Sequence, residues 1–233
     1  MDNFLTLIDR WLDPVSLAIV LGGTVLATLL RCGVAQGGAA LGQVARIARR
    51  PFDPAPARAE FSRQLRDIAE HGALRAEPVR IGDGDLDSLS DALSGPRPLE
   101  ALRMAHERAA RRRTEAARRA VEVFHQAAEL APVLGLAGTL IALGTMPAGG
   151  GEAGMAGAIA MAVVTTLYGI AAANFMFGPL GAAIERHAAR EEADRQAIVD
   201  WLEHAAGKAG PVQPRAETTA DIAHFPAGLR KAS

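Results

Sequence analysis

The feature that most constrains this chain is the run 155–184, which contains no charged side chain. A helix of this length, rising 1.5 Å per residue, would extend about 45 Å and exceed the roughly 30 Å hydrocarbon thickness of a bilayer. It would therefore tilt or continue beyond the bilayer. The alternative, a helix buried in a soluble domain, would need a larger core than a chain of 233 residues can wrap around it.

Two further apolar blocks, 12–30 and 130–146, approach the same thickness. The first block is not expected to belong to a cleaved signal peptide. Residues 1–11 include Asp2, Asp9 and Arg10 in place of a basic n-region, and no small-residue cleavage site follows the block. The three blocks together predict an all-α membrane protein with three transmembrane helices.

The connections between the blocks differ strongly in positive charge. The segment 31–129 holds 17 of the 25 Lys and Arg residues, the chain from residue 185 onward holds 7, and the turn 145–154 holds none. Because cytoplasmic loops are enriched in Lys and Arg, 31–129 and the C-terminus are expected in the cytoplasm. Residues 1–11 and the turn 147–154 are then expected on the outer, periplasmic side.

The cytoplasmic segments are predicted to be mostly helical. Residues 61–70 are typical of a short amphipathic helix, and 82–98 are typical of an acidic loop punctuated by Gly and Pro. From 99 to 130 the chain is rich in Ala, Arg and Glu without Gly or Pro, which predicts a helix of about eight turns that runs into the second block. A further cytoplasmic helix is expected over 185–206, and a disordered tail over 207–233.

Motifs for enzymatic chemistry are absent from the sequence. There is no phosphate-binding loop, nucleophile elbow or dinucleotide fingerprint, and the six His residues lack the spacing of a zinc site. The run 83–87 resembles the start of a calcium loop, but Ser88 replaces the required Gly and Ser94 the bidentate Glu. Cys32 is the single cysteine, and the net charge is −1. We therefore predict no catalytic residue, metal, cofactor or nucleic-acid partner.

Small residues follow one face of each of the last two blocks. Ala131, Gly135 and Thr139 recur every four residues in the second block, and the third block carries two neighbouring rows of the same kind. Small side chains allow membrane helices to pack closely. The predicted packing residues are Gly135, Gly138, Ala162 and Gly169.

Thr139, Thr165 and Thr166 differ from these small residues because a hydroxyl in lipid requires a partner. That partner is most often a carbonyl of its own helix, and sometimes water or an ion. No acidic or basic residue lies near the centre of any block, since Glu129 stands at the cytoplasmic mouth of the second block and Glu152 in the outer turn. A proton path normally requires a titratable carrier, so a second protein would have to supply the carboxylate.

Three strings in chain order resemble the MotA/TolQ/ExbB family, and most of all its flagellar stator branch. They are LDPVSLAIVLGGT at 12–24, APVLGLAGTLI at 131–141 and AMAVVTTLYG at 160–169, followed by Asn174 and Pro179. The resemblance implies a multi-pass subunit of the bacterial inner membrane that converts an H⁺ or Na⁺ gradient into mechanical work. It implies five copies around two copies of a single-span MotB/ExbD/TolR-like partner, whose membrane Asp carries the ion.

The family likeness also implies roles for individual residues. Pro132 would kink the second helix beside the ion path, and Thr139 and Thr166 would face that path, with Thr165 next to them. Glu77 matches a glutamate that engages the flagellar rotor. The basic residues Arg111, Arg112 and Arg113 are candidates for contact with anionic lipid or an acidic rotor-like partner, with a solvated helix face as the alternative.

The sequence departs from the family pattern at three points. The stator branch has four spans, whereas the three spans predicted here match the ExbB and TolQ plan. Those two proteins carry a Glu in the third span where this chain has Met161, and the arginine that engages the rotor falls on Ala69, with Arg66 nearest. Two other functions therefore remain open: an ExbB/TolQ-like subunit that energises the outer envelope, and a membrane scaffold without transport.

Overall fold

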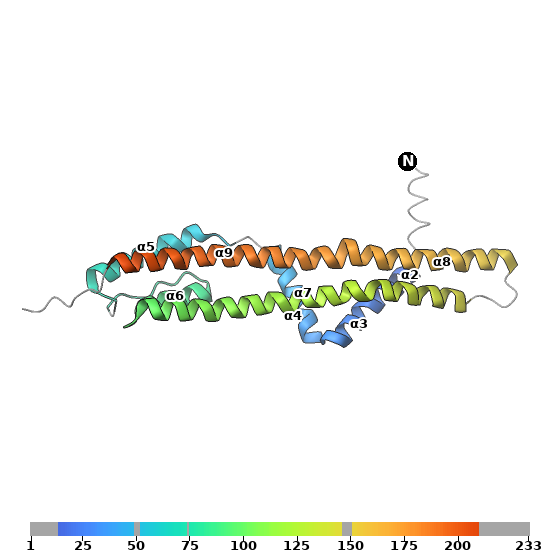
Figure 1. The fold of residues 1–233 in the computed structure, drawn as a ribbon, viewed down its shortest axis with the longest axis horizontal. Coiled ribbons are helices and arrows are strands. Elements are labelled where there is room, and N and C mark those ends of the chain that lie inside the picture. The colour runs from blue at the N-terminus through green and yellow to red at the C-terminus, as the bar shows by residue number, and fades with distance from the viewer. Residues whose placement is uncertain (1–13, 49–51, 74, 146–150, 210–233) are drawn as a thin grey trace, which may run out of the picture. The chain divides into compact units, whose positions relative to one another are not determined.

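The computed structural model describes residues 14–48, 52–73, 75–145 and 151–209, and all regular structure in these ranges is helical (Figure 1). Three helices are long and apolar enough to cross a membrane: Pro14–Cys32, a window within Pro98–Gly144, and one within Gly154–Gly207. The prediction of an all-helical fold with three long apolar helices is confirmed for the described residues, and these helices are consistent with a membrane protein. The side of the membrane on which each terminus lies stays a prediction. The predictions made for residues 1–11, for 146–150 of the turn and for the tail from residue 210 concern residues outside the described ranges.

The contacts divide the chain into two units. Unit 1 comprises Met1–Pro54 with His106–Ala197, and unit 2 comprises Ala55–Ala105 with Ile198–Ser233. The long helices α7 (Pro98–Gly144) and α9 (Gly178–Ala209) each contribute residues to both units. Each unit therefore has its own buried core and is described by itself.

The first apolar block is helical throughout in three pieces: α2 (Pro14–Leu17), the π-helix η1 (Ala18–Gly22) and α3 (Gly23–Cys32). Its buried face consists of Ser16, Val20, Thr24 and Thr28, which are at most 4% exposed and recur every four residues. The Thr24 hydroxyl donates to the Val20 carbonyl at 2.6 Å, and Thr28 donates to the Thr24 carbonyl at 2.7 Å. Neither hydroxyl is therefore left unpaired in an apolar segment.

The helix α4 (Val34–Ile47) was not predicted from the sequence. Gly33 separates it from α3 with a φ of 88°, a conformation that favours glycine, and the chain turns sharply there (Figure 1). One face of α4 buries Gly37 and Ala40, while Leu41 on the other face is 66% exposed. Arg31 is the first charged residue after the first block, and the next one, Arg46, lies near the end of α4.

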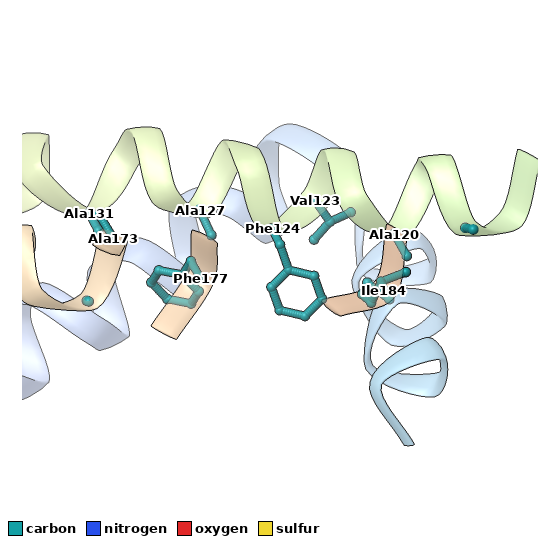
Figure 2. Close-up of a cluster of buried hydrophobic side chains, with 11 residues drawn as sticks. Ala120, Val123, Phe124, Ala127, Ala131, Ala173, Phe177 and Ile184 are labelled. Atoms are coloured by element: carbon teal, nitrogen blue, oxygen red, sulfur yellow. The ribbon is translucent and has the colours of Figure 1, made fainter. Parts of the chain in front are cut away.

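The core of unit 1 lies between α7 and the third apolar block, which comprises α8 (Gly151–Ala171), the π-helix η2 (Ala172–Phe177) and α9. α7 is continuous through residue 130, as its lack of Gly and Pro from 99 to 130 predicts. Figure 2 shows the rings of Phe124, on α7, and Phe177, in η2, side by side, with Ile184 beyond Phe124. These three side chains are at most 7% exposed.

Unit 2 packs α5 (Pro54–His71) and α6 (Gly84–Leu93) with the ends of α7 and α9 that belong to this unit. Phe61, Leu93 and Leu202 are fully buried. Arg103 donates to the Glu203 carboxylate at 2.7 and 2.9 Å, and this hydrogen bonding raises the pKa of the Arg103 guanidinium further above its ordinary value. The Arg103 guanidinium therefore stays protonated at physiological pH.

The acidic segment 82–98, predicted to be a loop, contains the helix α6. Asp83 is its N-cap residue, accepting from the backbone N–H groups of Asp85 and Leu86. Asp87 accepts from the Ile81 N–H at 2.7 Å. The loop prediction was wrong because carboxylates that seem to form a solvated cluster in the sequence instead satisfy the free backbone donors of a helix start.

Ser90 lies at the centre of a buried network that joins α5 to α6. Its hydroxyl accepts from the Val79 N–H at 2.7 Å and donates to the Gln64 side-chain carbonyl at 2.9 Å. The Gln64 amide in turn donates to the Ser90 carbonyl at 2.8 Å. Ser90 and Gln64 are 0% and 1% exposed, so the network is shielded from water.

We expect Ser90→Ala to weaken this part of unit 2, because it leaves the Val79 N–H and the Gln64 carbonyl oxygen without partners. The free energy of local unfolding should fall by about 1–3 kcal/mol, the cost of an unmade buried hydrogen bond. Hydrogen exchange of peptides from α5 and α6 measures this change. The matched control is Ser88→Ala, which removes only a hydroxyl bonded to Gly84 on the exposed side of α6. Equal exchange in the two variants would contradict the assigned role.

Candidate functional site

α7 and α8 approach each other most closely at two glycines. A Cβ atom on Gly169 would stand 2.6 Å from the Ala131 carbonyl oxygen, and one on Gly135 would stand 3.0 Å from the Thr165 carbonyl oxygen. Both obstacles are backbone atoms that no rotamer change can move. The third predicted packing glycine, Gly138, faces the Thr165 side chain, whose Cβ would lie 2.9 Å from an added Cβ.

The threonines predicted to lie on the ion path occupy different environments at this crossing. Thr165 is 0% exposed and its side chain fills the space left by Gly138. Thr139 and Thr166 are half-buried. The geometry therefore makes Thr165 a packing residue of the α7–α8 contact, and only Thr139 and Thr166 present surface to a neighbour, lipid or ion.

Each of these three hydroxyls donates its proton to a carbonyl of its own helix. Thr139 donates to Leu136 at 2.7 Å, while Thr165 and Thr166 both donate to the Ala162 carbonyl, at 2.9 and 3.2 Å. A hydroxyl has one donor and two lone pairs, so the oxygens keep accepting capacity. Ala162, predicted as a packing residue, thus also anchors two hydroxyls through its carbonyl.

Two departures from regular helix backbone lie near this crossing. Pro132 stands inside α7 without an N–H group, so the carbonyl of Ala128, four residues earlier, has no regular helix partner. Ala131 and Ala173 belong to one buried cluster (Figure 2), and Ala173 is part of the π-helix η2. Single π-turns inside helices are frequent at functional sites.

Asn174 compensates for the irregular backbone of η2. Its side-chain amide donates to the Ile170 carbonyl at 2.9 Å. Sequence reasoning gave Asn174 no function, and it also missed the polar buried face of the first block formed by Ser16, Thr24 and Thr28. The spacing of four residues between those hydroxyl residues was the available signal.

Charge is absent from the middle of this site. In the described part of the chain, the carboxylate that directly precedes the second apolar segment is that of Glu129, which is half exposed and 3.4 Å from His125. Met161, at the position where ExbB and TolQ carry Glu, is half-buried. No group of three His, Cys, Asp or Glu residues suited to a metal ion occurs in the described ranges.

The residues predicted to contact a partner lie in two places. Glu77 is exposed in the connection between α5 and α6 of unit 2, and Arg111 and Arg112 are exposed on α7 within unit 1. Arg113 is different: its side chain is 13% exposed, and it donates to the Glu192 carboxylate of α9 from Nε at 3.1 Å and from Nη2 at 2.8 and 3.1 Å. Successive residues of a helix point about 100° apart, so one basic run serves both an outer face and an internal ion pair.

Residues 86–197, which contain the whole α7–α8 crossing, match the model of the MotA/TolQ/ExbB proton channel family. The chemotaxis protein PomA of Vibrio alginolyticus is 25% identical over 201 residues, 84% of this chain and 78% of PomA. The uncharacterized protein YtxD of Bacillus subtilis (strain 168) is 36% identical over 86 residues, 36% of this chain and 32% of YtxD. The chain is therefore similar to MotA-like proteins.

Solved structures of MotA-like assemblies share this fold. MotAB of C. jejuni superimposes with a TM-score of 0.75 at 17% identity, covering 87% of this chain and 81% of that chain. The flagellar MotAB stator complex from Bacillus subtilis gives 0.71 at 20% identity, covering 84% and 80%. The family resemblance predicted from the three strings is thereby confirmed.

We expect Gly169→Ala to destabilise this MotA-like protein, because the added methyl group meets two backbones that can only move apart. Overpacking of this kind costs about 1–3 kcal/mol. The midpoint of thermal unfolding in mild detergent should fall. Gly157→Ala in the same helix is the matched control, since an added Cβ meets nothing within 4 Å there. A midpoint that falls equally in both variants would contradict the close approach.

Proposed function

We propose that this chain is the A-type subunit of an ion-driven stator in the bacterial inner membrane. In this role it crosses the membrane with three helices, surrounds a single-span partner and converts H⁺ or Na⁺ flow into movement of its cytoplasmic part. The likeness to PomA over most of both chains supports the assignment, as does the shared fold with MotAB. The observation that carries it is a close-packed helix crossing with accessible hydroxyls and no carboxylate.

The partner in this proposal is a MotB/ExbD/TolR-like subunit with a membrane Asp. Within the described spans this chain offers hydroxyl and carbonyl oxygens but no acidic group, so proton or ion exchange requires a carboxylate from another chain. Carboxylate and hydroxyl oxygens together can replace part of an ion's hydration shell. We place Thr139 and Thr166 on the side that faces the partner helix, near the backbone irregularity at Pro132.

A ring of five copies would cover the apolar faces that a single copy leaves open. Leu140 is 71% exposed on α7, and Val163 is 59% exposed on α8. In a membrane such faces meet either lipid or another helix, and the small residues beside them allow close approach. The proposed homopentamer and the surrounding lipid share these surfaces.

Transmission of movement would use the continuity of α7. This helix is 47 residues long and contributes residues to unit 1, which holds Pro132, and to unit 2. On the cytoplasmic side, Arg113 with Glu192 and Arg46 with Glu191 tie α7 and α4 to α9. The exposed Glu77 in unit 2 is then a candidate for contact with a flagellar rotor.

We expect Thr139→Val and Thr166→Val each to reduce ion flux and motor output strongly while assembly persists. Valine keeps the volume of threonine and removes the oxygen, and a single hydroxyl contributes only about 0.6 kcal/mol to helix association in membranes. Flux is measured in proteoliposomes that contain the partner, and output by motility of cells whose only copy is the variant. Thr165→Val is the control and should conduct normally, because its hydroxyl is enclosed by packing. If Thr139→Val and Thr166→Val both conduct normally, the ion path lies elsewhere, and the alternative function of a membrane scaffold without transport is favoured.

We expect the arginines at 111–113 to have two different roles, one in stability and one in motor output. Arg113→Gln should lower the free energy of unfolding by about 1–3 kcal/mol, because it removes hydrogen bonds to the Glu192 carboxylate. The double variant Arg111→Gln with Arg112→Gln should retain stability and lose motor output, since each charge near an anionic surface contributes about 1 kcal/mol to its attraction. Thermal unfolding and motility are measured on the same proteins. Full motility of the double variant would show that Arg111 and Arg112 form a solvated face.

A further inference from the structure

Thr139 lies on a face of α7 that continues beyond the second apolar segment. Going back along the helix from Thr139, the same face carries Leu136, Pro132, Glu129 and His125. The spacings between them alternate between three and four residues, so the five side chains follow one line along the helix. We call this line the Thr139 stripe. It joins a residue of the proposed ion path to a charged part of α7.

The Thr139 stripe is open in the described part of the chain. Leu136 is 57% exposed, and Pro132 and Thr139 are half-buried. The side chains of Glu129 and His125 are 52% and 66% exposed. The close contact between α7 and α8 uses glycines on a different face of α7. The stripe is therefore available to a neighbouring chain, to water or to an ion.

Glu129 is the first charged residue along the stripe from Thr139. Ten residues separate the two, which corresponds to a rise of about 15 Å along the helix. The sequence holds no charged side chain from 130 to 151. One turn further from the apolar segment, the His125 imidazole lies 3.4 Å from the Glu129 carboxylate. The stripe thus leads from a hydroxyl, past apolar side chains, to a carboxylate that is open to water.

Positive charge near the end of the stripe gives this carboxylate a purpose. The segment 31–129 holds 17 of the 25 Lys and Arg residues, which is why it is expected in the cytoplasm. A cation that leaves the membrane on this side would be repelled by such a surface. A carboxylate on its route opposes that repulsion, because fixed charge of one sign raises the local concentration of ions of the other sign.

We propose that Glu129 is the group to which the cation passes after it leaves the carboxylate of the partner subunit. This inference rests on the proposed function and adds an exit step to it. A proton would bind a carboxylate oxygen of Glu129 and then leave to water, and Na⁺ would be coordinated by the same oxygens. Cation channels use carboxylates in this way, and conduction requires a site that the ion can also leave. Half exposure of the Glu129 side chain meets that requirement.

Ion flux through proteoliposomes that contain the full chain and its single-span partner tests this role. The gradient is H⁺ in one series and Na⁺ in another. We expect Glu129→Gln to lower the flux of the conducted ion about tenfold, the lower end of the effect of local charge on ion concentration. Glu129→Asp should retain most of the flux, because it keeps the carboxylate. Thermal unfolding should not change in either variant, since the replaced side chain is half exposed.

The matched control is Glu115→Gln. Glu115 is also an exposed carboxylate of α7, 3.9 Å from Arg119, but it lies fourteen residues further from the apolar segment than Glu129. Removing its charge should leave the flux unchanged. Equal losses in Glu115→Gln and Glu129→Gln would show a general effect of surface charge and would contradict the exit role.

Normal flux through Glu129→Gln would overturn the exit role and leave the proposed function intact. If Glu129→Asp conducts as poorly as Glu129→Gln, the length of the side chain matters rather than its charge, and the exit role is wrong. No flux of either ion through the unaltered protein with its partner would overturn the proposed function, and the exit role with it.

Discussion

The backbone contact between α7 and α8 is the constraint on which the membrane part of this protein depends. Gly169 meets the Ala131 carbonyl, and Gly135 meets the Thr165 carbonyl, at distances that leave no room for a side chain. Helices in a bilayer gain little from the hydrophobic effect, because lipid is as apolar as their side chains. Close packing of small residues is then the main source of association, and this one crossing positions all three threonines.

The crossing also explains how polar groups are placed in an apolar environment. Buried hydroxyls donate to carbonyls of their own helices, and the side-chain amide of Asn174, within η2, donates to the Ile170 carbonyl. Their donors are thus satisfied, while the oxygens of Thr139 and Thr166 stay accessible on half-buried surfaces. In the described parts of the apolar segments, accepting oxygens are therefore present without a carboxylate.

Outside the apolar segments, ion pairs take over the role of close packing. Glu191 and Glu192 are adjacent in α9 and pair with different helices, Glu191 with Arg46 of α4 and Glu192 with Arg113 of α7. Salt bridges that are partly shielded and share several hydrogen bonds are stronger than exposed pairs. Together these pairs join α4 and α7 to α9.

The sequence by itself determined the helical class, the three long apolar segments and the unbroken helix through residue 130. Long uncharged runs and the absence of Gly and Pro act locally, whatever the chain packs against. Only the tertiary structure separated Thr165 from Thr166 and Arg113 from its neighbours, because which helix faces meet depends on contacts between distant residues. The sequence missed α4 and α6 for a related reason: Gly33 and Asp83 look like loop residues, and their roles as a helix stop and a helix cap follow from backbone geometry.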